Sequence, residues 1–376
     1  MTSHSEAAAP SALILMFSPS WMAPARLPEA LVDAGFQVGS YCHSDSLLAK
    51  SAFNSYRVET PSAGSAFANL VTAVRARQPD ILIPACELAV RFLHNIAEAA
   101  AADRLAGEFA DILYLVERSL GDPLLQRRAA SKIAAHAVAQ ELGIAVPRQR
   151  VVVGPEAALD GAAELGYPLV VKPEFGFAGN GIAICDTPAQ LQQACQVGKP
   201  GGTAPRLLQQ YQPGTRAMQA SVCWRGDLLE TITLAKERTH PEPTGPSTVV
   251  RMVDSPEAEA AARKLVKHYR ISGFCSIDFV LDEATGRAVF LEMNMRPSAG
   301  CTLGRLWGRD QGKALWCRLR GVDYLREAVA DGPQRVALFP NEWLRDPQSL
   351  HLLRDYHDVP WRDPALLRAY VDVLVK

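Results

Sequence analysis

The chain has 376 residues, of which 48% are apolar and 21% are charged, as in an ordinary globular protein long enough for two or three domains. Lysine and arginine total 39 and aspartate and glutamate total 40, so the formal net charge is -1. A balance this close to neutral offers no general attraction to nucleic acid or anionic lipid, which excludes partners held by overall charge.

Two further features of composition narrow the class of protein. The eight cysteines form no CxxC pair and lie in apolar stretches, which is typical of buried, reduced thiols. The apolar run Leu13–Phe17 follows no charged segment and is far shorter than the ~20 residues that span a bilayer. We therefore expect a cytoplasmic protein with no membrane segment.

The first third of the chain alternates strands with helices. The predicted strands are Ala12–Phe17, Gln37–Cys42 and Ile81–Pro84, and the predicted helices are Pro24–Ala34, Ser65–Arg77 and Leu88–Ala101. This alternation predicts a doubly wound parallel α/β domain that ends near residue 120. Such domains bind ligands at the carboxyl ends of their strands, which nominates Ser18–Ser20 and Cys86–Glu87.

The rest of the chain changes character twice. After Asp122–Leu124, a helix through Leu142 precedes a mixed stretch, whose predicted elements are Val151–Val153, Ala157–Leu165, Leu169–Val171, Ile182–Cys185 and Thr187–Cys195. From Arg206 strands dominate, namely Leu207–Tyr211, Ala217–Trp224, Leu228–Leu234, Thr248–Val253, Phe274–Leu281 and Ala288–Glu292, with one helix, Pro256–Tyr269. We therefore expect an α+β fold of two subdomains, and place domain boundaries at 1–120, 121–205, 206–325 and 326–376.

The last two of these strands form a hairpin that carries three hard oxygen ligands. Strand alternation places Asp278 on the face opposite Ile277 and Phe279, and Glu292 and Asn294 share a face if their strand is regular. Proteins bind Mg²⁺ through one or two carboxylates together with substrate phosphates. The alternative is a solvated outer face of an ordinary hairpin, which the apolar neighbours of Glu292 disfavour.

A lysine and a glycine-rich loop follow a second apolar strand. Lys172 ends the strand, and Gly176, Gly179 and Gly181 come after it. Small residues let backbone N–H groups approach phosphate oxygens, and the lysine supplies a positive charge. The alternative is a hairpin turn that needs positive φ angles. The lysine precedes the glycines and a strand follows them, so the loop is neither a Walker A loop nor a dinucleotide fingerprint.

Two weaker signals accompany these motifs. Lys132 lies on the helix before the glycine loop, where a solvated surface lysine is the alternative. The segment Gln209–Gly214 reads as a strand that leaves a subdomain and then turns, and a plain edge strand is the alternative.

The order of these features resembles the ATP-grasp superfamily. The resemblance covers roughly residues 122–310, and the preceding α/β domain is similar to the small domain that usually stands before an ATP-grasp fold. The Glu-Met-Asn-Met-Arg-Pro segment at 292–297 is similar to the Glu-x-Asn-x-Arg element of the branch that contains carbamoyl phosphate synthase and biotin carboxylase, the carboxylate–amine ligases.

The resemblance implies roles for individual residues. Lys132 and Lys172 would contact the nucleotide phosphates, and Gly176, Gly179 and Gly181 would form a lid over them. Gln209, Gln210 and Tyr211 would line the adenine pocket, with Gln209 or Gln210 standing where many members have Glu. The metal ligands would be Asp278, Glu292 and Asn294. Arg296 would face the transferred phosphoryl group and the substrate carboxylate, making Arg296 and Lys172 the expected catalytic residues.

The implied reaction joins a small carboxylate to an amine. The carboxylate attacks the γ-phosphate of ATP to give an acyl-phosphate, and the amine then displaces phosphate, with Mg²⁺ as the cofactor and Mn²⁺ as an alternative. Substrate contacts are assigned to Arg238, Arg251 and Arg305, with Glu87 as a holder of the amine. The family also implies a homodimer. Residues 172–185 are the candidate lid that keeps water from the intermediate.

Three other functions remain as alternatives. An ATP-grasp enzyme can carboxylate or phosphorylate a small acid without forming an amide. A regulatory module can bind a nucleotide without turnover, although a full catalytic set argues against it. A dinucleotide oxidoreductase is disfavoured, because no G-x-G-x-x-G motif follows Ala12–Phe17.

Overall fold

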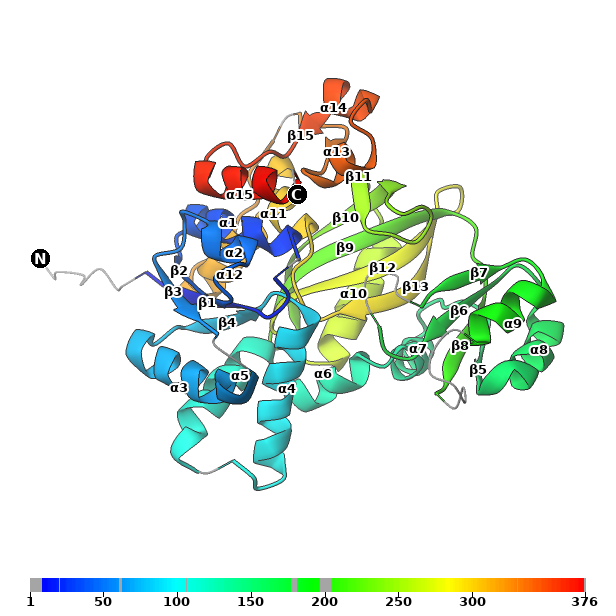
Figure 1. The fold of residues 1–376 in the computed structure, drawn as a ribbon, viewed down its shortest axis with the longest axis horizontal. Coiled ribbons are helices and arrows are strands. Elements are labelled where there is room, and N and C mark those ends of the chain that lie inside the picture. Colours follow the sequence, from blue (N-terminus) through cyan, green and yellow to red (C-terminus); the bar gives the residue numbers. More distant parts are fainter. Residues whose placement is uncertain are drawn as a thin grey trace, which may run out of the picture.

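The computed structural model describes residues 9–19, 21–60, 63–105, 107–176, 181–196, 204–329 and 331–374. Their strands form three sheets, which we call the N-terminal, small and large sheets (Figure 1). In the described part of the chain no helix has the length and apolar character needed to cross a bilayer.

The N-terminal sheet is parallel, in the order β3-β2-β1-β4. Its strands are β1 (Ser11–Met16), β2 (Gln37–Cys42), β3 (Tyr56–Glu59) and β4 (Ile81–Pro84). Its helices are η1 (Ala23–Arg26), α1 (Leu27–Ala34), α2 (Leu47–Lys50), α3 (Ala66–Arg77), α4 (Glu87–Ala101) and α5 (Ala110–Leu120). The central strand β1 is apolar and buried, as both-face coverage by helices requires. The predicted parallel α/β domain is confirmed.

The single helix expected after Asp122–Leu124 and through Leu142 is wrong, because the structure has two helices there. Helix α6 spans Pro123–Ala129 and α7 spans Lys132–Glu141. The hydroxyl of Ser131 accepts a hydrogen bond from the N–H of Ala134 and caps the second helix. This new start places Lys132 in the first turn of α7, where its side chain is buried rather than solvated.

The small sheet has the order β5-β8-β6-β7, and all its pairings are antiparallel. Its strands are β5 (Gln149–Val152), β6 (Leu169–Pro173), β7 (Ala183–Cys185) and β8 (Arg206–Gln210). Helices α8 (Gly154–Leu165) and α9 (Pro188–Gln196) cover its outer face and form a small core with Val171 and Leu208 (Figure 1). Alternation leaves Val170, Lys172 and Gln209 on the opposite face, toward the large sheet.

The large sheet has the order β13-β12-β9-β10-β11-β14-β15. Its long strands are β9 (Thr215–Trp224), β10 (Asp227–Thr239), β11 (Ser247–Met252), β12 (Gly273–Asp282) and β13 (Arg287–Asn294). One face packs on α7 and α10 (Pro256–His268) around Phe279 and Phe290. The other face packs at one end against α11 (Gly300–Leu303), α12 (Gln311–Arg320) and the N-terminal sheet, in one continuous core.

The last segment of the chain completes the large sheet. Strand β14 (Val336–Ala337) pairs with β11, and β15 (Tyr356–His357) pairs with β14. Helices α13 (Asn341–Arg345), α14 (Leu350–Arg354) and α15 (Pro364–Leu374) accompany these strands, and α15 packs on α2 of the N-terminal region (Figure 1). The segment is therefore built into both neighbouring layers.

Candidate active site

One large cavity lies between the small and large sheets. Its volume is about 460 Å³, and its wall includes Lys172, Gln209, Asp278, Glu292 and Arg296. Residues from β6, β8, β12, β13 and the chain that follows β13 therefore meet in one place, although up to 124 positions separate Lys172 from Arg296 in the sequence. The geometry brings together the principal residues that the sequence nominated.

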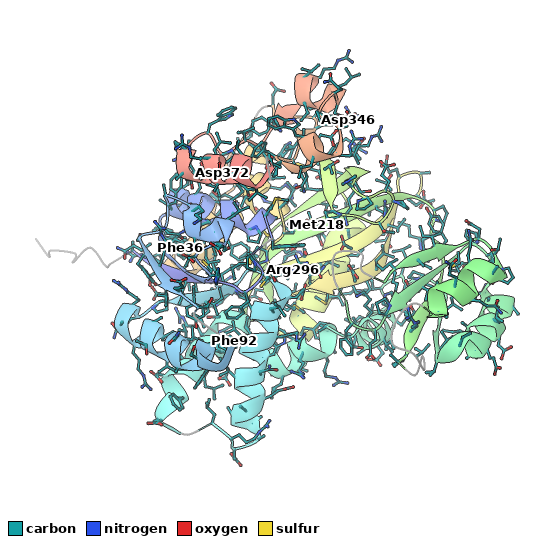
Figure 2. The ribbon with its side chains drawn as sticks, viewed as in Figure 1. Phe36, Phe92, Met218, Arg296, Asp346 and Asp372 are labelled. Carbon is teal, nitrogen blue, oxygen red and sulfur yellow. The ribbon has the colours of Figure 1, made fainter. Side chains whose placement is uncertain are left out.

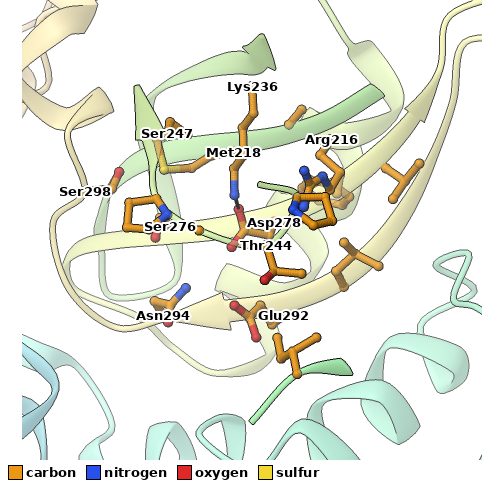
Figure 3. A pocket seen from close by; sticks show the side chains of 18 of the residues that line it. Arg216, Met218, Lys236, Thr244, Ser247, Ser276, Asp278, Glu292, Asn294 and Ser298 are labelled. Atoms are coloured by element: carbon orange, nitrogen blue, oxygen red, sulfur yellow. Dashed lines mark hydrogen bonds and ion pairs between the residues drawn. The ribbon is translucent and has the colours of Figure 1, made fainter. Parts of the chain in front are cut away.

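A β-bulge in β13 determines which side chains enter this cavity. Asp278 lies directly opposite Glu292, but its neighbour Phe279 lies opposite Phe290, so Leu291 is an extra residue in β13. Glu292 therefore faces the cavity, whereas Phe290, two positions earlier, is buried in the core on the other face. Beyond the bulge the strand is regular, so Asn294 shares the face of Glu292 and lies opposite Ser276, as predicted (Figure 3).

Lysines neutralise both carboxylates. The Nζ of Lys236 lies 2.8 Å from Oδ1 of Asp278 (Figure 3). The Nζ of Lys132 lies 3.3 Å from Oε2 of Glu292. Burial raises the pKa of Glu292, but Lys132, Lys172 and Lys236 together outweigh burial and leave that pKa below its usual value. Glu292 is therefore ionised and available as an oxygen ligand at neutral pH.

Lys172 is a buried cation. Its ammonium forms no hydrogen bond or ion pair with another residue that the structure describes, and its side chain lines the cavity. Burial lowers the pKa of Lys172 to about 8, with Lys132 adding to the decrease and Glu292 opposing it. Burying an unpaired ammonium costs free energy, and a phosphate placed beside it would remove that cost.

Lys132 lies behind the cavity wall. Its Nζ donates a hydrogen bond of 2.8 Å to the carbonyl of Gly176, and its backbone N–H donates to the carbonyl of Glu174. Lys132 thereby ties the start of the glycine loop to Glu292. Gly181 closes the described part of that loop with φ of 73°, an angle that favours glycine, whereas Gly179 lies outside the described residues.

The predicted adenine strand lines the cavity with Gln209, Gln210 and Tyr211. The backbone N–H groups of Gln210 and Tyr211 already donate to the carbonyls of Arg148 and Pro168, so those two groups are not free for a nucleobase. The side-chain amide of Gln209 donates to Oε1 of Gln149 at 2.8 Å.

A buried histidine, which the sequence analysis did not single out, connects this strand to the bulge. The Nε2 of His136 lies 2.7 Å from the carbonyl of Leu291, and the side-chain amide of Gln209 lies 3.2 Å from the same ring nitrogen and 3.4 Å from Nδ1. Burial between Lys172 and Lys132 lowers the pKa of His136 to about 3. The ring is therefore neutral and donates to the bulged carbonyl. Helical spacing marked Ala137 and Val138 as apolar but gave no signal for His136.

Arg296 lies where the N-terminal layer meets the large sheet (Figure 2). Its Nε donates a hydrogen bond of 2.8 Å to Oε1 of Glu87, the first residue of α4, and its guanidinium lies 5.0 Å from the ring centre of Trp21. Glu87 does not line the cavity but holds Arg296 from behind. Lys236 and Trp21 complete the site, and the sequence analysis assigned a role to neither side chain.

Three nominated arginines lie elsewhere. Arg238 donates to the carbonyl of Glu237, Arg251 pairs with Glu237 and Glu283, and Arg305 pairs with Asp33 on α1. None of these arginines lines the cavity. Strand β10, which carries Arg238, instead contributes Lys236 to the site, because a register shift between Lys236 and Arg238 interrupts the alternation that would otherwise place both on one face.

The donor set suits a divalent cation bound together with phosphate. The described residues contain no cluster of three or more histidine, cysteine or acidic side chains that could hold a metal by itself. Two carboxylates and one amide oxygen on a single face match the partial protein coordination that Mg²⁺ takes when phosphates complete its shell.

Comparison with known proteins agrees with this geometry. Residues 129–300 match the family model of the ATP-grasp domain. The central part of this chain is an ATP-grasp domain. The carbamoyl phosphate synthase large chain of Thermus thermophilus is 28% identical over 178 residues, which are 44% of this chain and 17% of that relative. This chain thus matches less than a fifth of that relative's length.

Solved structures show the same ATP-grasp fold. Biotin carboxylase from Campylobacter jejuni, in a complex with an ATP species, has a TM-score of 0.60 at 16% identity. The aligned region covers 84% of this chain and 72% of the biotin carboxylase chain. An L-amino acid ligase from Bacillus licheniformis has a TM-score of 0.55 at 16% identity, and the aligned region covers 83% of this chain and 74% of the ligase chain. These likenesses confirm the predicted fold class, an α/β domain followed by an ATP-grasp fold.

Proposed function

We propose that this chain is an ATP-dependent carboxylate–amine ligase that forms an amide through an acyl-phosphate and releases ADP and phosphate. The main observation in support of this proposal is that buried Lys172, the Asp278–Glu292 pair and Arg296 line one cavity. Lys172 would bind a phosphate, the Asp278–Glu292 pair would bind the metal ion, and Arg296 would bind the substrate carboxylate. A phosphoryl transfer to a carboxylate needs these three kinds of contact.

Each of the two steps of this reaction forms one bond and breaks another. An oxygen of the substrate carboxylate forms a bond to the γ-phosphorus of ATP while the bond from that phosphorus to ADP breaks. The amine nitrogen then forms a bond to the acyl carbon, phosphate leaves, and the nitrogen loses a proton. The first step gathers negative charge on the phosphoryl oxygens, so positioned cations lower its barrier.

Residues of this chain would neutralise that negative charge. Lys172 would hold phosphate oxygens, and Arg296, fixed by Glu87, would hold the substrate carboxylate. Asp278, Glu292 and Asn294 would hold Mg²⁺, which neutralises phosphate charge when bound. Residues 172–185, predicted as the lid, would exclude water from the acyl-phosphate, and the contact of Lys132 with Gly176 anchors one end of that segment.

A product assay tests the proposal. The full chain is incubated with ATP, Mg²⁺ and pairs from a panel of acids and amines, and ADP, phosphate and the mass of the amide are measured. Amide formed in a one-to-one ratio with ADP supports the proposal. ADP formed only with bicarbonate would indicate carboxylation, the main alternative, and ATP binding without ADP under any condition would indicate a nucleotide-binding module.

A cytoplasmic location stays a prediction from composition, and a homodimer stays a prediction of the family resemblance. The partners in this proposal are small molecules, since neither the charge balance nor the cavity provides a surface for nucleic acid.

A further inference from the structure

Apolar side chains line part of the cavity. Met218 of β9 lies directly opposite Asp278, on the side away from Glu292, so the wall continues across the sheet from the predicted metal site. Trp21, Met22, Ala299 and Leu338 also line the cavity, together with the polar Ser247, Ser298 and Asn341, and we call Met218 and these four apolar residues the apolar wall. A ligand group seated here would be removed from water against hydrocarbon and indole surface.

Charge at the cavity is one-sided. The basic residues that line it are Lys172, Arg216, Lys236 and Arg296, whereas Asp278 and Glu292 are the only carboxylates among its described lining residues. Both of these are the proposed metal ligands, and both already face lysines. Glu87 is engaged by Arg296. A ligand carboxylate therefore meets an excess of positive side chains, although Lys236 and Arg296 already pair with Asp278 and Glu87, whereas a ligand ammonium meets no unpaired carboxylate among the described lining residues.

These two observations define a substrate class. We propose that the activated substrate is a carboxylic acid that carries an apolar substituent and no ammonium group on its α-carbon, an inference that rests on the proposed function. Its carboxylate lies between Arg296 and the transferred phosphate, and its substituent packs on the apolar wall. A zwitterionic α-amino acid of the same shape binds more weakly, because burying an ammonium without a counter-charge is costly.

The C-terminal segment builds part of this selectivity. Leu338 follows β14 directly and contributes to the apolar wall. The hydroxyl of Tyr370 on α15 donates 2.8 Å to the carbonyl of Met22, and Arg26 contacts both the carbonyl and the carboxylate of Asp358. The loop that carries Trp21 and Met22 is therefore held in place by residues from the end of the chain.

Matched ligand pairs test the substrate class on the unmodified full chain. The pairs are 4-methylpentanoate with leucine and 3-phenylpropanoate with phenylalanine, which differ only in the α-ammonium. Binding is measured by calorimetry in the presence of Mg²⁺ and a non-hydrolysable ATP analogue, and ADP formation is measured with ATP. We expect the plain acids to bind at least about tenfold more tightly. Equal or tighter binding of the amino acids would overturn the inference.

The two readouts separate this inference from the proposed function. If the plain acids bind more tightly but yield neither ADP nor amide with any amine, the ligase proposal fails and the ligand class stands. If amino acids yield ADP and amide while plain acids do not, the ligase proposal stands and the ligand class fails.

A variant locates the selectivity. Leu338→Ala should weaken binding of 3-phenylpropanoate about tenfold and leave ATP binding unchanged, because it removes apolar wall surface and no charged group. Leu353→Ala is the matched control, since Leu353 lies in the same segment and is 80% exposed. Unchanged binding of 3-phenylpropanoate by a folded Leu338→Ala protein would contradict the placement of the substituent on the apolar wall. If this variant does not fold, the matched ligand pairs still test the substrate class.

Discussion

Asp278 and Glu292 stand directly opposite each other on β12 and β13, one residue beyond the point where Leu291 interrupts the pairing. Without that extra residue, alternation would put Glu292 on the same face as Phe290, inside the core. The bulge thus turns a carboxylate from an apolar strand into the cavity. Bulges commonly aim side chains in this way beside active sites.

Glu292→Gln should reduce Mg²⁺-dependent ADP formation by about a hundredfold or more, because a neutral amide is a poor ligand for a divalent cation. The fold should persist, since the substitution keeps the size of the side chain. Steady-state ADP formation and circular dichroism measure the two effects. Glu283→Gln in the turn of the same hairpin is the matched control. Full activity of the Glu292 variant would refute the metal assignment.

Lys172→Met should raise the dissociation constant for ATP more than about tenfold, as expected for loss of a buried phosphate partner. The ligand-free protein should unfold at an equal or higher urea concentration, because a desolvated ammonium is removed. Calorimetry with ATP and urea titration measure both. Lys267→Met on the exposed face of α10 should change neither quantity. If ATP protects the Lys172 variant against heating as well as the parent, the phosphate role is wrong.

His136→Phe should lower the free energy of unfolding by about 1–3 kcal/mol, because the carbonyl of Leu291 and the amide of Gln209 lose a partner. It should also raise the KM for ATP through movement of the bulge. The loss should be smaller at pH 6 than at pH 8 by about 0.8 kcal/mol, because burial lowers the folded pKa of His136 to about 3 while the unfolded histidine, with a pKa of about 6.5, binds a proton at pH 6. Urea titrations measure this, with exposed His268→Phe as the control. An equal loss at the two pH values would mean that the folded ring titrates as it does in the unfolded chain.

Asp358 should make stability depend on pH. Burial raises the pKa of Asp358 to about 6, with Arg26 and the backbone N–H of Phe339 opposing that rise. The folded state then binds this proton more tightly than the unfolded chain, where the aspartate pKa is about 3.9. The Asp358 contribution to the free energy of unfolding should therefore be complete below about pH 4, fall by about 3 kcal/mol as pH rises to about 6, and then level off.

Asp358→Asn isolates this effect. Relative to the parent, the variant should gain stability as pH rises from 4.5 to 6.5, and urea titrations at several pH values measure the change. Asp372→Asn on the exposed side of α15 should run parallel to the parent at every pH. Parallel curves for Asp358→Asn as well would show that this carboxyl titrates normally in the folded state.

The sequence alone predicted much of the fold because its signals are local. Alternation placed Asp278 opposite in face to Ile277 and Phe279, and the structure confirms this. The parallel α/β domain followed from strands and helices in turn. The sequence analysis did not predict that a second helix begins after Ser131. A serine within an apolar periodic pattern looks like an ordinary helix residue, and only the structure shows that its hydroxyl caps the helix.

Only the tertiary structure decided how the parts of the site meet. Periodicity cannot reveal a bulge, since the extra residue is defined by the partner strand, so the separation of Phe290 from Glu292 required the pairing register. Nor can a sequence show that Lys236 rather than Arg238 faces Asp278, or that Glu87 holds Arg296 from 209 positions away. Local patterns determine which residues share a strand face, whereas the register and packing of distant segments determine which of those faces enclose the cavity.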